Sequence, residues 1–412
     1  MKCEETLSAI IQRESSAIAD WMWNLRTAIH QYPELGYEEE RTSDLVASTL
    51  EGLGIKFERG LAGTGVVGLI EGSAPGPVVA LRADMDALPV TEKTGAAYAS
   101  KRPGLMHACG HDGHTAMLLG AAAVLNRMKS SLQGSVKLIF QPGEEAGGAA
   151  ERMVSEGVLT DPDVQMIYGV HLWPTIESGK VAVPAGMCMA SSTAVHINIK
   201  GRGGHCGMPH KSVDALTVAT QIVNMMQIIV SRLVDPLEPA VVNIGVLRSG
   251  ERRNVVADEA EIAASIRAFS NATRDAIEQR IERIVSAVAQ VFDAQHSIQF
   301  IHLVPPLIND EHASKIAEQA VKACLGPLSF ENRQRPEMTG EDFAFYLEHT
   351  PGALVLIGSR DETKGFTELL HSPRMDFDSA PLVVGCQALC AIACHALTSL
   401  NGTYGTQQDD RC

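Results

Sequence analysis

Two sequence patterns alternate along this chain, and together they limit the folds that it can adopt. Residues 17–190 interleave helix-like stretches with short apolar runs, and residues 304–400 return to the same rhythm. Residues 191–303 begin instead with alternating apolar and polar residues, as half-exposed strands do. A chain of 412 residues is also too long for one compact core, since a domain holds roughly 150 residues. We therefore predict one domain that is interrupted by an inserted second domain.

The outer segments predict an α/β domain in which helices cover a sheet. Helical patterns span residues 17–30, 42–53, 115–128, 312–325 and 382–397, and apolar runs typical of buried strands span residues 66–70, 78–82, 136–140, 166–170 and 353–357. Gly and Pro residues separate these stretches. Such alternation is typical of layered α/β architecture. We assign residues 1–190 and 304–400 to this domain and interpret residues 401–412 as a frayed tail.

The middle segment, residues 191–303, predicts a ferredoxin-like α+β domain. Its expected strands span residues 193–200, 240–247, 261–269 and 297–303, and its expected helices span residues 212–233 and 273–292. The resulting order, β-α-β-β-α-β, is that of a ferredoxin-like sandwich.

Charge and composition exclude several classes of partner. The chain has 34 Lys and Arg against 49 Asp and Glu, a formal net charge of -15, which repels phosphate backbones and anionic lipid. The first 30 residues carry charges and no secretory h-region, and no uninterrupted apolar run approaches the roughly 20 residues of a membrane span. We therefore expect a cytoplasmic protein without nucleic-acid or membrane partners.

The nine cysteines indicate reduced thiols rather than a disulfide framework, because their count is odd and the chain is large. Cys386, Cys390 and Cys394 recur every four residues along one face of the last expected helix. A metal site there is conceivable, but small buried residues that line a helix seam are the favoured interpretation.

Polar side chains gather where the expected strands end. These are Asp84, Asp86, Glu144, Glu145 and His171. The carboxyl ends of parallel strands meet at one edge of an open α/β sheet, so these side chains should converge. Between them in the sequence, Cys109 and His111 stand in a loop before a helix that Asp112 is placed to cap. Thiolate, imidazole and carboxylate groups are the ligands of borderline divalent metals, so the pattern predicts a metal centre.

The neighbouring Glu144 and Glu145 suggest hydrolysis, because adjacent carboxylates after a strand point in different directions. One can bind metal while the other takes a proton from metal-bound water and returns it to the leaving group. A solvated acidic turn is the simpler interpretation of a Glu-Glu pair taken alone. Its place at the same sheet edge as the other ligand types favours the hydrolase.

Six motifs in one order carry a family resemblance. They are Leu-Arg-Ala-Asp-Met-Asp-Ala-Leu-Pro at residues 81–89, Cys-Gly-His-Asp-Gly-His at 109–114, Gln-Pro-Gly-Glu-Glu at 141–145, Gly-Val-His-Leu at 169–172, Gly-Arg-Gly-Gly-His at 201–205 and Leu-His-Ser-Pro at 370–373. Over nearly its whole length the chain resembles the metallopeptidase family of aminoacylases, glutamate-releasing carboxypeptidases and dipeptidases. Within that family it is most similar to hippurate hydrolases, N-acyl-amino-acid amidohydrolases and auxin-conjugate hydrolases.

The resemblance implies a fold and an activity. The fold is a zinc-exopeptidase-like α/β/α catalytic domain with an inserted ferredoxin-like domain that serves as lid and dimerisation domain. The activity is hydrolysis of N-acyl amino acids to a carboxylic acid and an amino acid. It also implies two divalent metal ions per subunit, which are manganese, zinc, cobalt or nickel, and a homodimer or dimer-based oligomer formed through the lid.

The resemblance further implies roles for particular residues. The metal ligands are Cys109, His111, Glu145, His171 and His371, and Glu144 is the general base and acid. The wider family has a His-x-Asp motif where this chain has Asp84 and Asp86, and a bridging Asp where it has Cys109. We therefore expect the two aspartates to orient the ligands rather than to bind metal.

Three residues of the inserted domain complete the implied site. His205 reaches the active site of the partner subunit and binds the developing oxyanion, and Asn254 and Arg267 contact the substrate carboxylate. Without the resemblance, His205 would be interpreted as a loop histidine and Arg267 as an outward strand residue.

Two other functions are compatible with this sequence. A dipeptidase or aminopeptidase of the same fold would need an acidic group that holds a free substrate amine. A non-catalytic ligand-binding or metal-binding relative would be expected to lack Glu144 or part of the ligand set, and this chain has both. We therefore predict an N-acyl-amino-acid amidohydrolase.

Overall fold

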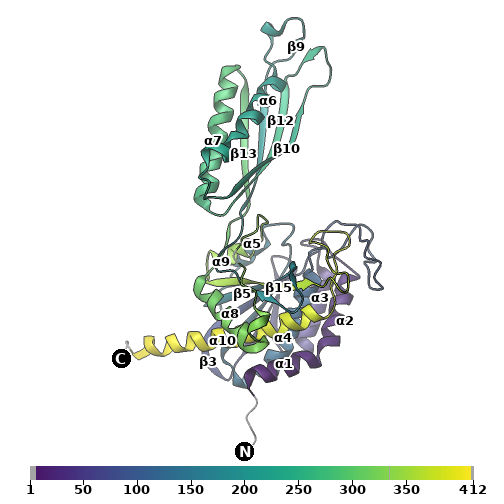
Figure 1. Ribbon diagram of the computed structural model, residues 1–412, viewed down its shortest axis with the longest axis vertical. Helices are drawn as coiled ribbons and strands as arrows, with labels where there is room; N and C mark the ends of the chain where they lie inside the picture. The colour runs from purple at the N-terminus through teal and green to yellow at the C-terminus, as the bar shows by residue number, and fades with distance from the viewer. Residues whose placement is uncertain (1–5, 334, 410–412) are drawn as a thin grey trace, which may run out of the picture. The chain divides into compact units, whose positions relative to one another are not determined.

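The computed structural model describes residues 6–333 and 335–409, which belong to two units (Figure 1). Within the described residues, unit 1 comprises the chain up to Gly186, the segment Ile308–Arg335 and the chain from Phe345 onward. Unit 2 comprises Met187–Leu307 and Pro336–Ala344. The second, short segment of unit 2 falls in the part of the chain that the sequence pattern assigned to the catalytic domain.

Unit 1 is built on a mixed seven-stranded sheet with the order β1-β2-β4-β3-β5-β15-β6. The strands are β1 (Lys56–Leu61), β2 (Gly65–Glu71), β3 (Ala74–Asp84), β4 (Gln133–Gln141), β5 (Met166–Glu177), β6 (Val181–Ala182) and β15 (Gly352–Arg360). The four central strands, β4, β3, β5 and β15, run parallel, and the outer pairs are antiparallel. The central strands are buried along most of their length, as their apolar runs predict.

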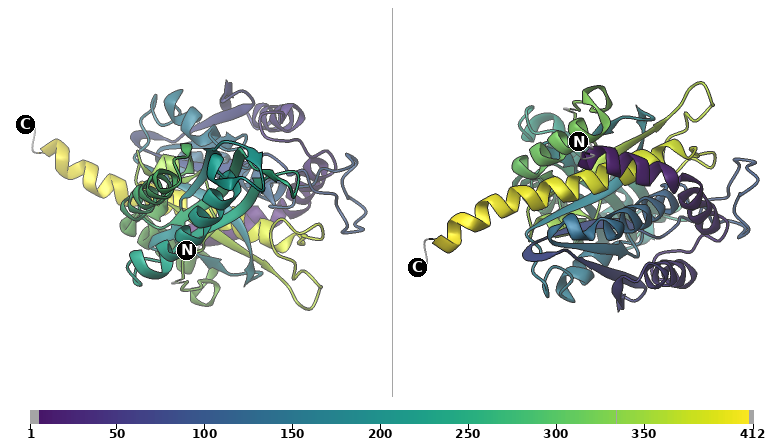
Figure 2. Two further views of the ribbon diagram at one scale, coloured as in Figure 1. Left: turned by 90° about the horizontal axis from the view of Figure 1, so that it is seen from above. Right: turned by 90° about the horizontal axis from the view of Figure 1, so that it is seen from below.

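Helices cover both faces of this sheet. They are α1 (Leu7–Ala17), α2 (Ala19–His30), α3 (Glu40–Gly52), α4 (His111–Arg127), α5 (Ala149–Ser155), α8 (Glu311–Leu325) and α10 (Ala380–Asp409), with 3-10 turns η1 (Lys129–Ser131) and η4 (Pro327–Ser329). Helices α4 and α10 pack on β3 and on each other, and α10 also contacts α1 and α8 (Figure 2, right). Helix α5 contacts β4 and lies on the opposite side of the sheet (Figure 1). The predicted α/β/α layers are confirmed.

The helix layer is closely packed because small residues allow it. A Cβ atom at Gly120 of α4 would lie 2.2 Å from Met22 Sδ of α2. A Cβ atom at Gly385 of α10 would lie 2.3 Å from Met117 Sδ of α4. Glycine at these two positions therefore brings both neighbouring helices close to α4, whose residues are buried from His111 to Leu125.

Unit 2 has the predicted ferredoxin-like arrangement. Its antiparallel sheet has the order β10-β12-β8-β13 and is covered by two helices. The elements are β8 (Ser192–Lys200), α6 (Ala215–Met226), β10 (Ala240–Ser249), β12 (Glu259–Ala268), α7 (Asn271–Val291) and β13 (Gln295–Val304), with the small pair β9 (Gly204–His205) and β11 (Val255–Val256) and the turns η2 (Pro209–Lys211) and η3 (Ile229–Leu233). Alternate residues of β8, namely Val195, Ile197 and Ile199, face the separate core of this unit.

Three short elements lie where unit 1 and unit 2 join along the chain. They are β7 (Gly186–Met189), β14 (Leu307–Asn309) and α9 (Ala344–Leu347). Strands β7 and β14 form a two-stranded sheet.

Several elements differ from their predicted bounds. The unpredicted α1 begins where the Thr6 side chain accepts a hydrogen bond from the N–H of Ala9. Helix α4 begins at His111 rather than at residue 115, directly after Gly110 with φ 87°. Asp112 is therefore a residue of the first turn and not the cap; its carboxylate faces Arg26 instead. The long helix predicted over residues 212–233 is α6 followed by a separate π-helical turn, η3.

Strand β5 and helix α10 extend further than predicted. Strand β5 continues through residue 171 to Glu177, because β15 pairs with it beyond Val170, so His171 lies inside the strand rather than after it. Helix α10 runs to Asp409, so residues 401–409 are helical rather than an irregular tail; no proline interrupts them. Residues 410–412 of the predicted tail lie outside the described residues.

Helix α10 is apolar enough to cross a membrane by length and composition over Ala380–Gly402, but 78% of its most apolar window is buried inside the protein. Gln387 and His395 divide the apolar residues of this helix into shorter runs, which is why the sequence analysis found no apolar run as long as a membrane span. Cys386, Cys390 and Cys394 are buried on this helix. Among the described residues, none of them belongs to a group of three potential ligand atoms within 4.8 Å of one another, which supports packing as their role.

Replacement of Cys390 by alanine tests the packing interpretation. The thiol of Cys390 is fully buried and lies 3.8 Å from the carbonyl oxygen of Ala121. Its removal should lower the free energy of unfolding by about 1 kcal/mol, through a small cavity, and leave the metal content unchanged. Urea denaturation and metal analysis measure the two effects. A metal ion lost from Cys390→Ala would contradict the interpretation.

Candidate metal centre

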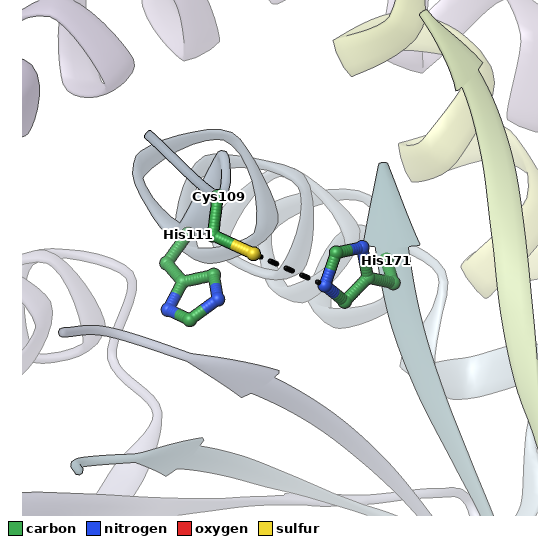
Figure 3. A group of neighbouring side chains, drawn as sticks. All are labelled: Cys109, His111 and His171. Carbon is green, nitrogen blue, oxygen red and sulfur yellow. Dashed lines mark hydrogen bonds between the residues drawn. The ribbon is translucent and has the colours of Figure 1, made fainter. Parts of the chain in front are cut away.

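The structure brings all five predicted ligands together in unit 1. Ligand atoms of Cys109, His111 and His171 lie within 4.8 Å of one another, and so do those of Cys109, Glu145 and His371. Cys109 belongs to both groups and therefore joins them. Figure 3 shows its Sγ directed at Nε2 of His171, 3.6 Å away.

Glu144 lies beside these ligands. Its carboxylate forms a further group with His111 and Glu145, whose ligand atoms also lie within 4.8 Å of one another. Glu144 is half-buried, as is Glu145, at the turn that follows β4. The predicted general base thus stands next to the predicted ligands.

Two unusual backbone conformations position the ligands. Gly110, between Cys109 and His111, has φ 87°, and a Cβ atom there would lie 2.9 Å from Leu172 Cδ1, so the loop requires glycine. His371 has φ 65°, which is rare for a residue with a side chain. The N–H of His371 donates to the carbonyl of Ala108 at 2.8 Å, which ties the loop of His371 to the loop of Cys109. Backbone strain of this kind is concentrated at functional sites.

Two buried atoms of the candidate site lack hydrogen-bond partners. His111 Nε2 is one of them, and Glu145 Oε1 is the other, although His371 Nε2 lies 3.1 Å from that oxygen without hydrogen-bond geometry. Buried polar atoms normally have partners. An imidazole nitrogen without a partner, beside a carboxylate, a thiol and two more imidazoles, is a donor set that fits borderline divalent metal ions.

The protonation of these ligands also fits a cation. Burial and the charges of Glu145, Glu144 and Asp84 raise the pKa of the Cys109 thiol well above its ordinary value. Burial opposes charge on His111, but Asp84 and Asp86 outweigh it and raise the pKa of His111 to about 10. A bound cation reverses both shifts, because it favours the thiolate and the neutral imidazole.

Asp86 holds both the turn with the two glutamates and the ring of His111. Its Oδ1 accepts a hydrogen bond from the N–H of Glu144 at 3.1 Å, and its Oδ2 accepts one from the N–H of Glu145 at 2.9 Å. Nδ1 of His111 lies 3.2 Å from Oδ1 of Asp86. A proton on Nδ1 leaves Nε2 with the lone pair that a metal ligand needs. Asp86 therefore orients one ligand and the predicted base together.

Glu39 is a site residue that the sequence analysis missed. It is fully buried, and its Oε1 accepts a hydrogen bond from the N–H of Gly143 at 2.7 Å. The hydroxyl of Thr64 donates to its Oε2, also at 2.7 Å. Glu39 and Asp86 thus bind three consecutive N–H groups of one turn. In the sequence, Glu39 stands inside an acidic run without a motif, so nothing distinguished it from its neighbours.

Asp84 is held on both of its oxygen atoms. Arg82 Nη1 donates to Oδ2 at 2.7 Å, and His114 Nδ1 lies 2.6 Å from Oδ1. Burial opposes the charge of Asp84, but His111, His114 and Arg82 outweigh it and hold the pKa of Asp84 well below its ordinary value. These contacts support an orienting role for Asp84. Its Oδ1 also lies in a group of potential ligand atoms with His111 and His114.

A buried ion-pair network supports the other side of α4. Arg26 Nε and His30 Nδ1 each lie 2.7 Å from Oδ2 of Asp112, and Arg26 Nη2 lies 2.9 Å from Oδ1 of Asp376. The hydroxyl of Tyr98 donates to Oδ2 of Asp376 at 2.7 Å. This network holds Asp112, which follows the predicted ligand His111, and Asp376, which lies in the loop after His371. Arg26 and His30 gave no sequence signal, because a polar pair on an amphipathic helix is ordinary.

The three predicted lid residues lie in unit 2, whereas the candidate ligands lie in unit 1. His205 is exposed on β9, and its Nδ1 accepts a hydrogen bond from the N–H of Gly207 at 3.0 Å. Asn254 lies close to it, because its carbonyl accepts from the N–H of Cys206 and β11 pairs with β9. Burial lowers the pKa of Arg267, on β12. The functions of these three residues stay predictions.

Comparison with known proteins identifies relatives along nearly the whole chain. The sequence profile of Peptidase family M20/M25/M40 matches residues 80–395. IAA-amino acid hydrolase ILR1-like 2 from Arabidopsis thaliana is 40% identical over 385 residues, which are 92% of this chain and 86% of that protein. Thermostable carboxypeptidase 1 from Saccharolobus solfataricus is 38% identical over 387 residues, which are 93% of this chain and 97% of that protein.

A solved structure of similar fold is that of the Bacillus subtilis YXEP protein, described as a dinuclear metal binding peptidase from the M20 family. It matches with a TM-score of 0.81 at 33% sequence identity, over 93% of this chain and 99% of that chain.

Replacement of Asp86 by alanine tests its role in the site. Loss of the carboxylate removes the acceptor of His111 and of the two glutamate N–H groups, so metal affinity should fall about 10–100-fold. Competition with a chromophoric chelator measures this affinity. Asp44→Ala, at an exposed ion pair of the same unit, is the matched control and should bind metal as the wild type does. Equal affinity in Asp86→Ala would refute the role.

Proposed function

Because this chain belongs to Peptidase family M20/M25/M40 and is a hydrolase of amide bonds, we propose that it cleaves N-acyl amino acids to a carboxylic acid and an amino acid. The observation that supports this proposal is the carboxylate of Glu144 within 4.8 Å of ligand atoms of His111 and Glu145. A carboxylate beside a metal centre is the minimum that metal-assisted hydrolysis requires.

The proposed cofactor is a pair of divalent metal ions. The residues that would hold them are Cys109, His111, Glu145, His171 and His371. When bound, such a pair polarises the amide carbonyl and lowers the pKa of water. The mixed sulfur, nitrogen and oxygen donors suit zinc, manganese, cobalt or nickel. The description of the YXEP relative as dinuclear supports the number of two.

In the proposed reaction, Glu144 accepts the proton of the attacking water and returns it to the departing amine nitrogen. The turn geometry suits this division of work. Asp86 accepts the N–H groups of both glutamates, but only Glu145 shares a ligand group with Cys109 and His371 among the described residues. The backbone of the proposed base is thereby held in place beside the proposed ligands.

We propose that unit 2 supplies the remaining substrate contacts. His205 would stabilise the negative charge that develops on the carbonyl oxygen, and Asn254 and Arg267 would bind the carboxylate of the substrate. The support is the family resemblance of the motif at residues 201–205 and the chemistry of the three side chains.

On the same resemblance we propose a homodimer formed through unit 2. The described cysteines form no disulfide, which supports the proposed cytoplasmic location.

Glu144→Gln should bind two metal ions per chain and lose about 10²–10⁴-fold in kcat, because the amide cannot take a proton from water. Metal analysis and steady-state kinetics on one N-acyl amino acid measure the two quantities. Glu151→Gln, at an exposed position on α5, is the matched control and should keep full activity. Turnover of Glu144→Gln near that of the wild type would sink the assignment of the base.

A substrate panel tests the reaction itself. N-acetyl, N-benzoyl and N-indoleacetyl amino acids should be hydrolysed faster than free dipeptides. Chelation should abolish the activity, and manganese, cobalt, nickel or zinc should restore it. Faster cleavage of dipeptides would favour the peptidase alternative, which the similarity to a carboxypeptidase also supports. Bound metal without turnover on any amide would favour a binding protein.

A further inference from the structure

His114 is a fully buried histidine of α4 that the proposed reaction does not use, and both of its ring nitrogens have partners. The backbone N–H of Leu172 lies 2.7 Å from Nε2, and Oδ1 of Asp84 lies 2.6 Å from Nδ1. A backbone N–H can only donate, so Nε2 must carry the lone pair. The proton therefore resides on Nδ1 and is donated to Asp84. The structure thus fixes the tautomer of this ring.

The residue whose N–H His114 accepts, Leu172, also orients the proposed ligand His171 through its carbonyl group. The carbonyl oxygen of Leu172 lies 2.7 Å from Nδ1 of His171. A carbonyl can only accept, so this Nδ1 carries the proton and Nε2 keeps the lone pair that faces Cys109. The rings of His114 and His171 also pack together, with centroids 4.5 Å apart.

Strand β15 pairs with β5 through His171 and Leu172, but β3, on the other side of β5, does not reach that far. The register of β3 with β5 ends at Gly169, three residues before Leu172. Beyond that point, His114 provides the acceptor that a strand carbonyl would otherwise provide. Asp84 holds the far side of the ring and is itself held by Arg82 Nη1 at 2.7 Å. Hydrogen bonds thus lead from Arg82 through Asp84 and His114 to the N–H of Leu172, and the backbone of Leu172 connects them to its carbonyl group, which contacts His171.

We infer that His114 is a positioning residue of the metal centre, which acts by accepting the N–H of Leu172 and thereby orients His171. This inference rests on the proposed function, because it presumes that His171 binds metal. The alternative is that His114 is itself a ligand, since its ring shares a group of potential ligand atoms with Asp84 and His111. A direct ligand role would require Nδ1 to lose its proton and its contact with Asp84, because Nε2 is occupied.

Two amide variants separate the two ends of the ring. His114→Gln places an amide oxygen near the position of Nε2 and can still accept the N–H of Leu172. His114→Asn places an amide N–H near the position of Nδ1 and can still donate to Asp84, but it does not reach Leu172. If the contact with Leu172 is the important one, Gln should replace His114 better than Asn does.

The experiment measures metal stoichiometry and affinity by chelator competition for wild type and both variants, with hydrogen exchange of the peptide that contains Leu172. We expect two metal ions per chain at saturation in all three proteins. We expect His114→Gln to bind within about 3-fold of wild type, and His114→Asn to bind about 10–100-fold more weakly, with faster exchange at Leu172.

Each other outcome contradicts a defined statement. One metal ion fewer in both variants would make His114 a ligand and overturn the inference. Equal affinity in all three proteins, or weaker binding by Gln than by Asn, would also overturn it while the proposed metal centre stands. A wild-type protein that binds no metal would overturn the proposed function and the inference together.

Discussion

Two buried carboxylates hold the backbone of the turn after β4, and the chemistry of the site depends on this contact. Asp86 and Glu39 accept three consecutive N–H groups, from Gly143 to Glu145. Buried charges are costly unless they are hydrogen-bonded, and backbone N–H groups stabilise a carboxylate without neutralising it. At Glu39 these hydrogen bonds act against burial, which raises the pKa of its carboxyl group. Carboxylates that lie close together at a sheet edge repel one another, and a bound divalent cation would offset this repulsion.

The first turn of α4 separates this negative site from a second charged network. His111 faces Asp86, whereas the next residue, Asp112, faces Arg26 and His30 on the other side of the helix. Consecutive helical residues point in different directions, so one turn can serve two environments. The guanidinium of Arg26 is fully buried and makes a short ion pair, which anchors the helix where it carries a ligand. The contacts of Asp112 thus help to fix the position of His111 from the opposite side of the helix.

Residue type and strand order made much of this site predictable. The remaining site residues are recognised only by their hydrogen-bond partners, which the sequence does not show. The polar side chains at the ends of β3 and β4 and the histidine of β5 were expected to converge because the carboxyl ends of parallel strands meet. His371 follows no strand and was expected only from family resemblance; its left-handed backbone is set by tertiary contact with Ala108. No sequence pattern distinguished Glu39 and Arg26, because a charged residue that becomes buried is recognised only by the residues it contacts in the fold. Helix α4 begins early because of Gly110, whose φ a sequence pattern does not reveal.

Three neighbouring imidazoles show why sequence spacing cannot assign ligands by itself. His111 and His114 are three residues apart on one helix, and both lie near the carboxylate of Asp84. The difference lies in the second nitrogen of each ring: Nε2 of His111 has no partner, whereas Nε2 of His114 accepts the N–H of Leu172. His171 resembles His111, because its Nδ1 is bound to a carbonyl and its Nε2 faces Cys109. In our proposal, a histidine of this site binds metal where its Nε2 has no backbone partner, and supports a neighbour where the backbone occupies Nε2.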